Sequence, residues 1–199
     1  DGDGLFLKVG KTGAASWLLR LQRDGKRQDI GLGSAKLVTL AEARAKAAEL
    51  RKAVIPVAGF GTRFLPVTRA VPKTLLPVLD TPGIQFAVEE ALEAGIDHLV
   101  FVVSEGQEAI NTYFDRLTEL EDALERQGKT DLLNRMIKIA ETSQISYVYQ
   151  HERRGIGHAI LQARPLIGEE PFAVLFPDDL IWNESPTISD MIDIYTETN

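Results

Sequence analysis

The sequence predicts an α/β protein: a parallel sheet with helices on both faces, preceded by a small three-stranded antiparallel sheet plus one helix. Two observations predict this. From residue 53 onward, short apolar runs alternate with stretches of helical periodicity, as a parallel sheet with crossover helices requires. Before residue 53, strand patterns follow one another closely, and helical spacing begins only near Leu40.

Charge divides the chain at the same place. Residues 1–52 hold 11 Lys and Arg against 6 Asp and Glu, a net charge of +5, whereas residues 53–199 carry −12. Such asymmetry indicates two modules with different partners, with the boundary at 52/53. The alternative is that the asymmetry reflects chance surface composition, and the residue pattern has to decide between the two explanations.

Composition excludes several classes of protein. A hydrophobic fraction of 44% allows a real core, and the absence of cysteine excludes disulfides and thiolate metal sites and fits a cytoplasmic protein. No apolar run approaches the roughly 20 residues that span a bilayer, so we expect no membrane contact. The acidic start is unlike a signal peptide, and the missing initiator methionine suggests a fragment or a processed chain.

The first module has the pattern of a β-β-β-α unit. Apolar residues alternate over residues 5–9, and strands are predicted over 16–23 and 26–32, with the hairpin signal Asp24-Gly25 between them. Thr39 begins a capping box that predicts a helix after it.

That helix runs into the apolar residues 53–57 without a Gly, Ser or Pro linker. Independent domains normally meet through a flexible segment, so a direct join suggests a gene fusion, an engineered chimera or a rearranged reading frame. The sequence leaves these three origins open.

The second module alternates strands and helices. Thr81-Pro82 is expected to supply an N-cap and a first-turn proline for a helix that Gly95 closes. Strands are predicted over 53–57, 97–103, 145–149 and 172–176, and further helices over 105–140 (broken near Gly128), over about 157–165, and from Ser185-Pro186 to the C-terminus.

Three motifs follow the ends of predicted strands, where ligands bind in open α/β sheets. The first is the loop with Gly59 and Gly61, whose backbone amides can approach a phosphate while Arg63 and Lys73 neutralise its charge. The others are Gln150, with a glycine loop after it, and residues 177–179. This combination predicts a nucleotide site.

Each motif also has a simpler interpretation. Gly-x-Gly is common in ordinary turns, Gln150 alone would suit a surface position, and Asp178-Asp179 would suit a turn or a helix cap. His158 is most simply structural, because no second histidine stands at metal-ligand spacing.

Residues 1–52 resemble the arm-type DNA-binding domain of phage-type tyrosine recombinases, on stretches that include Ser16-Trp17, residues 24–27, 31–34 and 40–44. The resemblance implies a sheet inserted into a groove of duplex DNA, with basic residues on phosphates. The alternative is that these residues only solvate a hairpin. Recombination itself is excluded, because the catalytic domain and its tyrosine nucleophile are missing. The expected DNA contacts are Arg20, Arg23, Lys26 and Arg27.

Residues 53–199 closely resemble bacterial UTP–glucose-1-phosphate uridylyltransferases. The resemblance rests on residues 53–66, Pro72-Lys73, residues 155–159 and Pro177-Asp178. Related thymidylyl- and adenylyltransferases usually carry a Gly-Gly-x-Gly-Thr-Arg-Leu version of the first motif, so the uridylyl type is favoured. It implies a truncated Rossmann-like nucleotidyltransferase sheet.

The resemblance also implies roles for single residues. Gln150 would read the uracil edge, Arg63 and Lys73 would bind the triphosphate as catalytic residues, and Asp178 would hold Mg²⁺. UTP and glucose 1-phosphate would be the substrates, and UDP-glucose and pyrophosphate the products. The expected nucleotide-binding residues are Ala58, Gly59, Gly61, Thr62, Gln150, Gly155 and Gly157.

The family's chains continue well beyond the point that matches Asn199, so sugar contacts, further sheet strands and much of an oligomer interface would be missing. We therefore expect weak UTP binding, little or no turnover, and an unpaired sheet edge that promotes poor solubility or homo-oligomers. Three functions stay open: a uridylyltransferase fragment, a DNA-binding module with an incidental C-terminal part, and a non-catalytic fusion.

Overall fold

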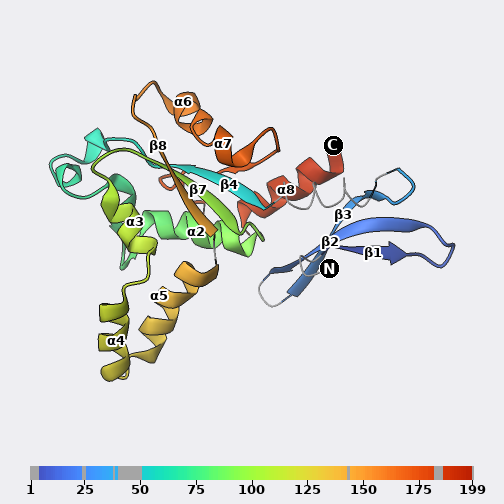
Figure 1. Ribbon diagram of the computed structural model, residues 1–199, viewed down its shortest axis with the longest axis horizontal. Helices are drawn as coiled ribbons and strands as arrows, with labels where there is room; N and C mark the ends of the chain where they lie inside the picture. Colours follow the sequence, from blue (N-terminus) through green and yellow to red (C-terminus); the bar gives the residue numbers. More distant parts are fainter. Residues whose placement is uncertain are drawn as a thin grey trace.

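The computed structural model describes residues 5–23, 26–37, 39, 51–142, 144–181 and 186–198, and for most of residues 19–31 only the backbone. A parallel sheet carries helices on both faces, and a separate antiparallel sheet lies beside it (Figure 1). The predicted α/β class and the order of its two parts are confirmed.

The small sheet consists of β1 (Leu5–Val9), β2 (Ala15–Arg23) and β3 (Lys26–Ser34), antiparallel and in sequence order. This is the predicted meander, although β3 runs two residues further than expected. The predicted turn at residues 24–25 and the helix after Leu40 lie outside the described residues. So do the side chains of the expected DNA contacts Arg20, Arg23, Lys26 and Arg27.

The main sheet contains β4 (Lys52–Pro56), β7 (His98–Val103), β8 (Gln144–Tyr149) and β9 (Ala173–Val174). Their order is β8-β7-β4-β9, and all neighbours are parallel. Because the strands are parallel, the carboxyl ends of all four meet at one edge of the sheet. β9 is shorter than the predicted strand over 172–176.

Helices cover both faces of this sheet (Figure 1). On one face lie α2 (Gly83–Glu93), α3 (Glu108–Phe114) and α8 (Thr187–Thr198), and on the other α6 (Ile156–Leu161) and α7 (Arg164–Ile167). Among the described residues, no helix is both long and apolar enough to cross a bilayer.

A single helix was expected over 157–165, but the chain forms α6 and α7 instead. Pro165 stands in the first turn of α7 and lacks the N–H group that would continue α6, which is why the helix divides there.

The alternation of side chains along each strand divides the core into two layers. Ile55 and Phe101 are fully buried against the α2 face, while Val54 and Val100 are fully buried against Ala163 on the α6–α7 face. Strands that are covered on both sides are largely apolar, which is why residues 53–57 and 99–103 read as continuous hydrophobic runs.

The small sheet meets the main domain through α8. Leu5 and Leu32 belong to the same buried cluster as Ile188 and Ile192 of α8. β3 and β4 nevertheless belong to different sheets. The boundary at 52/53 stays a prediction.

The predicted N-cap at Thr81 is wrong. Thr81–Pro82 forms a short strand, β6, that pairs with β5 (Pro77–Val78), and Pro82 occupies the cap position of α2. The hydroxyl of Thr81 donates to Asp80 (3.1 Å) and accepts from Arg135 (2.8 Å). It is therefore turned to these charged neighbours and caps no helix amide.

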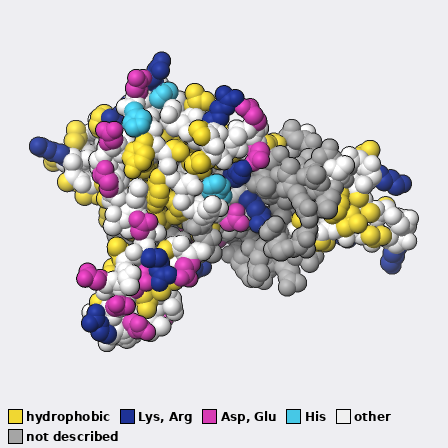
Figure 2. Space-filling model, in the orientation of Figure 1, with side chains coloured by type: hydrophobic (Ala, Val, Ile, Leu, Met, Phe, Trp, Pro, Cys, Tyr) yellow, Lys and Arg dark blue, Asp and Glu magenta, His cyan; other side chains and the backbone are white. Residues whose placement is uncertain are grey.

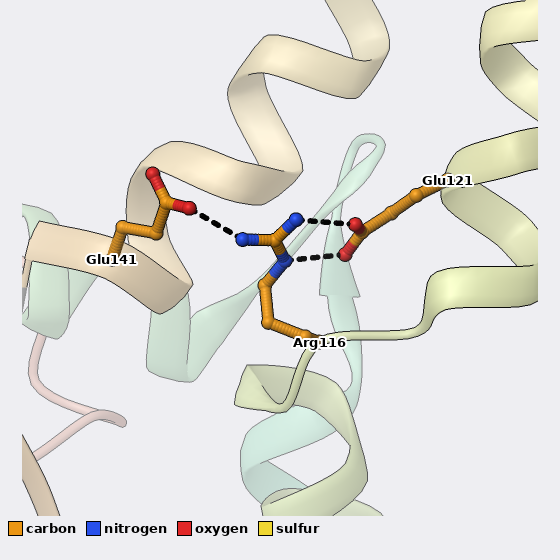
Figure 3. Close-up of polar contacts among 3 residues, drawn as sticks. All are labelled: Arg116, Glu121 and Glu141. Atoms are coloured by element: carbon orange, nitrogen blue, oxygen red, sulfur yellow. Dashed lines mark hydrogen bonds and ion pairs between the residues drawn. The ribbon is translucent and has the colours of Figure 1, made fainter.

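Residues 105–142 contain two further helices after α3, namely α4 (Thr118–Arg126) and α5 (Thr130–Thr142). The break near Gly128 is confirmed, and a second, unexpected break falls at residues 115–117. There the guanidinium of Arg116 donates to Glu121 of α4 (2.5 and 2.7 Å) and to Glu141 of α5 (Figure 3).

These ion pairs tie α4 to α5, and the Arg116 guanidinium lowers the pKa of Glu121. The two helices project from the sheet, with acidic and basic side chains interspersed over them (Figure 2).

Candidate functional site

A cavity of about 470 Å³ opens at the carboxyl edge of the main sheet. It brings together nine of the ten residues predicted to bind or act on the nucleotide. Gly157 is the exception, since it lines a separate cavity beside α6 and α7. The nine residues in the lining are Ala58, Gly59, Gly61, Thr62, Arg63, Lys73, Gln150, Gly155 and Asp178.

The glycine loop after β4 depends on Gly61, whose backbone is left-handed (φ 62°, ψ 36°). A Cβ atom at this position would lie 2.7 Å from Cβ of Lys73 and 3.0 Å from Cγ2 of Thr68. The hydroxyl of Thr68 also donates to the carbonyl of Gly61 (2.9 Å). Glycine at 61 therefore allows the segment that carries Lys73 to pack directly against the loop.

The carbonyl groups of the loop are held by side chains that follow β7. Gln107 donates to the carbonyls of Val57 (3.1 Å) and Gly59 (3.4 Å). Ser104 donates to that of Ala58 (3.2 Å). Among the described residues, nothing accepts a hydrogen bond from the amide of Gly59 or of Gly61. Unpaired amides in a glycine loop are suited to an anion.

Charged side chains line the same cavity as this loop. Lys73 forms an ion pair with Asp178, and its ammonium lies 5.4 Å from the centre of the Phe64 ring. The hydrogen bond from Lys73, with a smaller effect of Arg63, holds the pKa of Asp178 below its ordinary value. Asp178 therefore stays ionised at neutral and weakly acidic pH.

Gln150 lies at the carboxyl end of β8 and is only 5% exposed. Its amide nitrogen donates to the carbonyl of Gly155 (3.3 Å) and contacts Nδ1 of His158 (3.1 Å). The other ring nitrogen, Nε2, lies 3.3 Å from the amide nitrogen of Gln162, so the His158 ring is held between two amide side chains. Gly155 (φ 97°) forms the N-terminal boundary of α6.

The sequence reasoning missed several residues at the cavity. Thr74 and Arg153 line it, and the hydroxyl of Thr74 is buried without a hydrogen-bond partner among the described residues. Ser104, which holds the loop without lining the cavity, was also missed, although it directly follows β7 and the strand-end rule applied elsewhere would have found it. Arg153 had only a weak signal, as half of a basic pair before Gly155.

Unpaired loop amides and cations that line one cavity at the carboxyl edge of a parallel sheet are an arrangement typical of the class of α/β proteins that bind nucleotides. The family model described as "Nucleotidyl transferase" matches residues 52–199. The chain belongs to the nucleotidyl transferase family. A second family model, "Arm DNA-binding domain", matches residues 1–55.

Curated relatives show which members of this family the chain resembles. The chain is 49% identical over 150 residues to UTP–glucose-1-phosphate uridylyltransferase 2 of Staphylococcus saprophyticus and to the uridylyltransferase of Staphylococcus haemolyticus. These matches cover 75% of this chain and 52% of each relative. The chain thus spans about half the length of the curated relatives that it matches.

A solved structure is similar over the same part of the chain. The UTP-bound UGPase from Acinetobacter baumannii is 43% identical, with a TM-score of 0.71 over 75% of this chain and 53% of that one.

Proposed function

We propose that this chain binds UTP in the glycine-loop cavity, as the nucleotide-binding part of a UTP–glucose-1-phosphate uridylyltransferase. The reaction joins UTP and glucose 1-phosphate to give UDP-glucose and pyrophosphate. The observation that carries the proposal is the single cavity that contains the unpaired loop amides, Gln150, Lys73 and Asp178. The names of the relatives supply the substrates.

The nucleotide is held mainly by backbone and amide groups. Ala58, Gly59 and Gly61 bind its phosphates through their amides, with Thr62 beside them at the start of the next turn. Gln150, fixed by His158 and Gly155, presents its amide to the uracil edge. Gly157 lies on α6, outside the cavity lining, and its contact with the nucleotide stays a prediction.

Two cationic side chains and one carboxylate balance the charge of the triphosphate. Arg63 and Lys73 bind phosphate oxygens and stabilise the departing pyrophosphate. Asp178 fits a magnesium ligand, since it is ionised and lines the cavity, and Mg²⁺ is commonly held by one or two carboxylates plus substrate phosphates. No larger group of metal ligands gathers among the described residues. When bound, Mg²⁺ would neutralise charge on phosphate oxygens.

The chemistry requires positioning more than reactive side chains. An oxygen of glucose 1-phosphate attacks the α-phosphorus of UTP in line with the leaving pyrophosphate, and the protein forms no covalent bond. Before the nucleotide arrives, Lys73 is occupied by Asp178. With UTP bound, Lys73 would contact phosphate instead, and Asp178 would be free to hold Mg²⁺.

Calorimetry with UTP and Mg²⁺ tests this proposal. Lys73→Ala is expected to weaken UTP binding about tenfold or more, because a charge-assisted bond to phosphate is lost. Asp178→Asn is expected to remove the dependence of binding on Mg²⁺. Lys129→Ala, on the α4–α5 turn and away from the cavity, should bind like the unchanged chain. Wild-type affinity in both cavity variants, or no UTP binding by the unchanged chain, would overturn the proposal.

A second function, binding of duplex DNA by residues 1–52, is favoured by the match to the arm domain and by the net charge of +5. Replacing both Lys26 and Arg27 with alanine is expected to weaken binding to duplex DNA and to reduce its salt dependence by about two phosphate contacts. Fluorescence anisotropy across a salt series measures both, with Lys129→Ala again as the control. DNA affinity unchanged by the double substitution speaks against this function.

Four further expectations stay predictions alongside these functions: the domain boundary at 52/53, a homo-oligomer, a cytoplasmic location, and little or no turnover by the 199 residues.

A further inference from the structure

Arg153 joins three segments at the rim of the cavity. It lies in the loop after β8, and its Nε donates to the carbonyl of Ala58 (3.3 Å) while Nη2 donates to the hydroxyl of Ser104 (3.0 Å). Its guanidinium carbon lies 3.6 Å from the centre of the Phe60 ring, so the two planar groups are in contact. One side chain therefore connects the ends of β4, β7 and β8.

The bond to Ala58 has a direct consequence for the next amide. The carbonyl of Ala58 and the N–H of Gly59 belong to one planar, trans peptide group, so they point in opposite directions. Arg153 donates to this carbonyl, and the Ser104 hydroxyl, whose one proton is shared with Oε1 of Gln107 (3.0 Å), is a second donor to it. Together they fix the plane of the peptide. The Gly59 amide is then held facing away from them, with no partner of its own among the described residues.

Phe60 keeps the guanidinium of Arg153 in place. The ring is 63% exposed, which is unusual for so large an apolar side chain, and it covers one face of the guanidinium. Stacking of this kind limits the rotamers of a long side chain that would otherwise be mobile, so the two hydrogen bonds form at lower entropic cost.

We propose that Arg153 is a positioning residue that presets the Gly59 amide for a phosphate group of the nucleotide, with Phe60 holding Arg153 in place. The inference rests on the proposed UTP site and adds to it a residue that acts through the loop. The geometry of the donors decides this role: the guanidinium reaches Ala58 and Ser104 together, whereas a lysine ammonium in its place would keep only the charge.

Calorimetry with Mg²⁺–UTP on the full chain separates positioning from simple charge. Arg153→Gln and Arg153→Lys are both expected to bind UTP about tenfold more weakly, because both lose the fork that holds the peptide. Phe60→Leu should weaken binding by itself but add little in the Arg153→Gln background, since the two side chains act as one unit. Arg154→Gln is the matched control, because Arg154 is exposed and pairs with Glu152 (3.6 Å).

A second measurement does not depend on UTP. The ¹⁵N relaxation order parameter of the Gly59 amide is expected to fall in Arg153→Gln and to stay unchanged in Arg154→Gln. If the unchanged chain fails to bind UTP, the proposed function is wrong, and the order parameter by itself then tests whether Arg153 holds the loop. Full rescue of affinity by Arg153→Lys, or an unchanged order parameter in Arg153→Gln, overturns the positioning role.

Discussion

Replacing Gly61 with alanine is expected to lower the free energy of unfolding by about 2–5 kcal/mol and to weaken UTP binding more than tenfold. Two costs add. An alanine in the left-handed backbone (φ 62°) costs about 1–2 kcal/mol. The new methyl group would also lie 2.7 Å from Cβ of Lys73 and 3.0 Å from Thr68, so one segment has to move. Urea denaturation and calorimetry measure the two effects.

Gly128 provides the matched control for this substitution. Its backbone is also left-handed (φ 68°), but a Cβ atom there would meet nothing within 4 Å. Gly128→Ala should therefore show only the backbone cost, about 1–2 kcal/mol, with unchanged UTP binding. Equal losses of stability and affinity in the two variants would contradict the close approach of Lys73 to the loop.

The second large effect is expected at Phe101, in the centre of the main sheet. The side chain is fully buried in β7, and its ring centre lies 5.1 Å from that of Phe114 and 5.7 Å from that of Tyr147. Phe101→Ala removes a whole ring between a strand and a helix. We expect a loss of about 3–5 kcal/mol in the free energy of unfolding, through lost burial and the cavity that remains.

Two further variants make this prediction specific. Phe101→Leu keeps most of the apolar volume and should cost less than half as much. Leu132→Ala, on a half-exposed position of α5, should change the unfolding free energy by at most about 0.5 kcal/mol. The denaturant midpoints of the three variants rank their losses of stability, provided that the dependence of the unfolding free energy on denaturant is the same in all three. A loss at Phe101 no larger than at Leu132 would contradict the described core.

The strands of the fold were predictable because they carry strong local patterns. Residues 53–57 and 99–103 are apolar on both faces, which marks buried parallel strands, and the small sheet shows alternation with a hairpin signal. Helix boundaries were less predictable. Thr81 looks like an N-cap from its neighbours alone, yet pairing with β5 and the contact with Arg135 place it in a strand.

The site was predictable in part for the same kind of reason. Glycines after a strand, a nearby arginine and lysine, and a carboxylate after a later strand are local features, and the rule that ligands bind at the carboxyl edge joins them. Thr74 has no such local mark and Arg153 only a weak one, whereas Ser104 directly follows β7 and the same rule would have found it. The relevance of all three comes from contacts between segments that are far apart in sequence.

The sequence by itself determined the fold class, the two-part order of the chain and the residue types at the strand ends, because periodicity and turn chemistry are local. Only the tertiary structure decided which of these residues share one cavity. It placed Gly157 outside that cavity, paired Lys73 with Asp178, and brought Arg153 onto the peptide between Ala58 and Gly59. Such contacts depend on the packing of whole strands and helices, which short-range patterns do not encode.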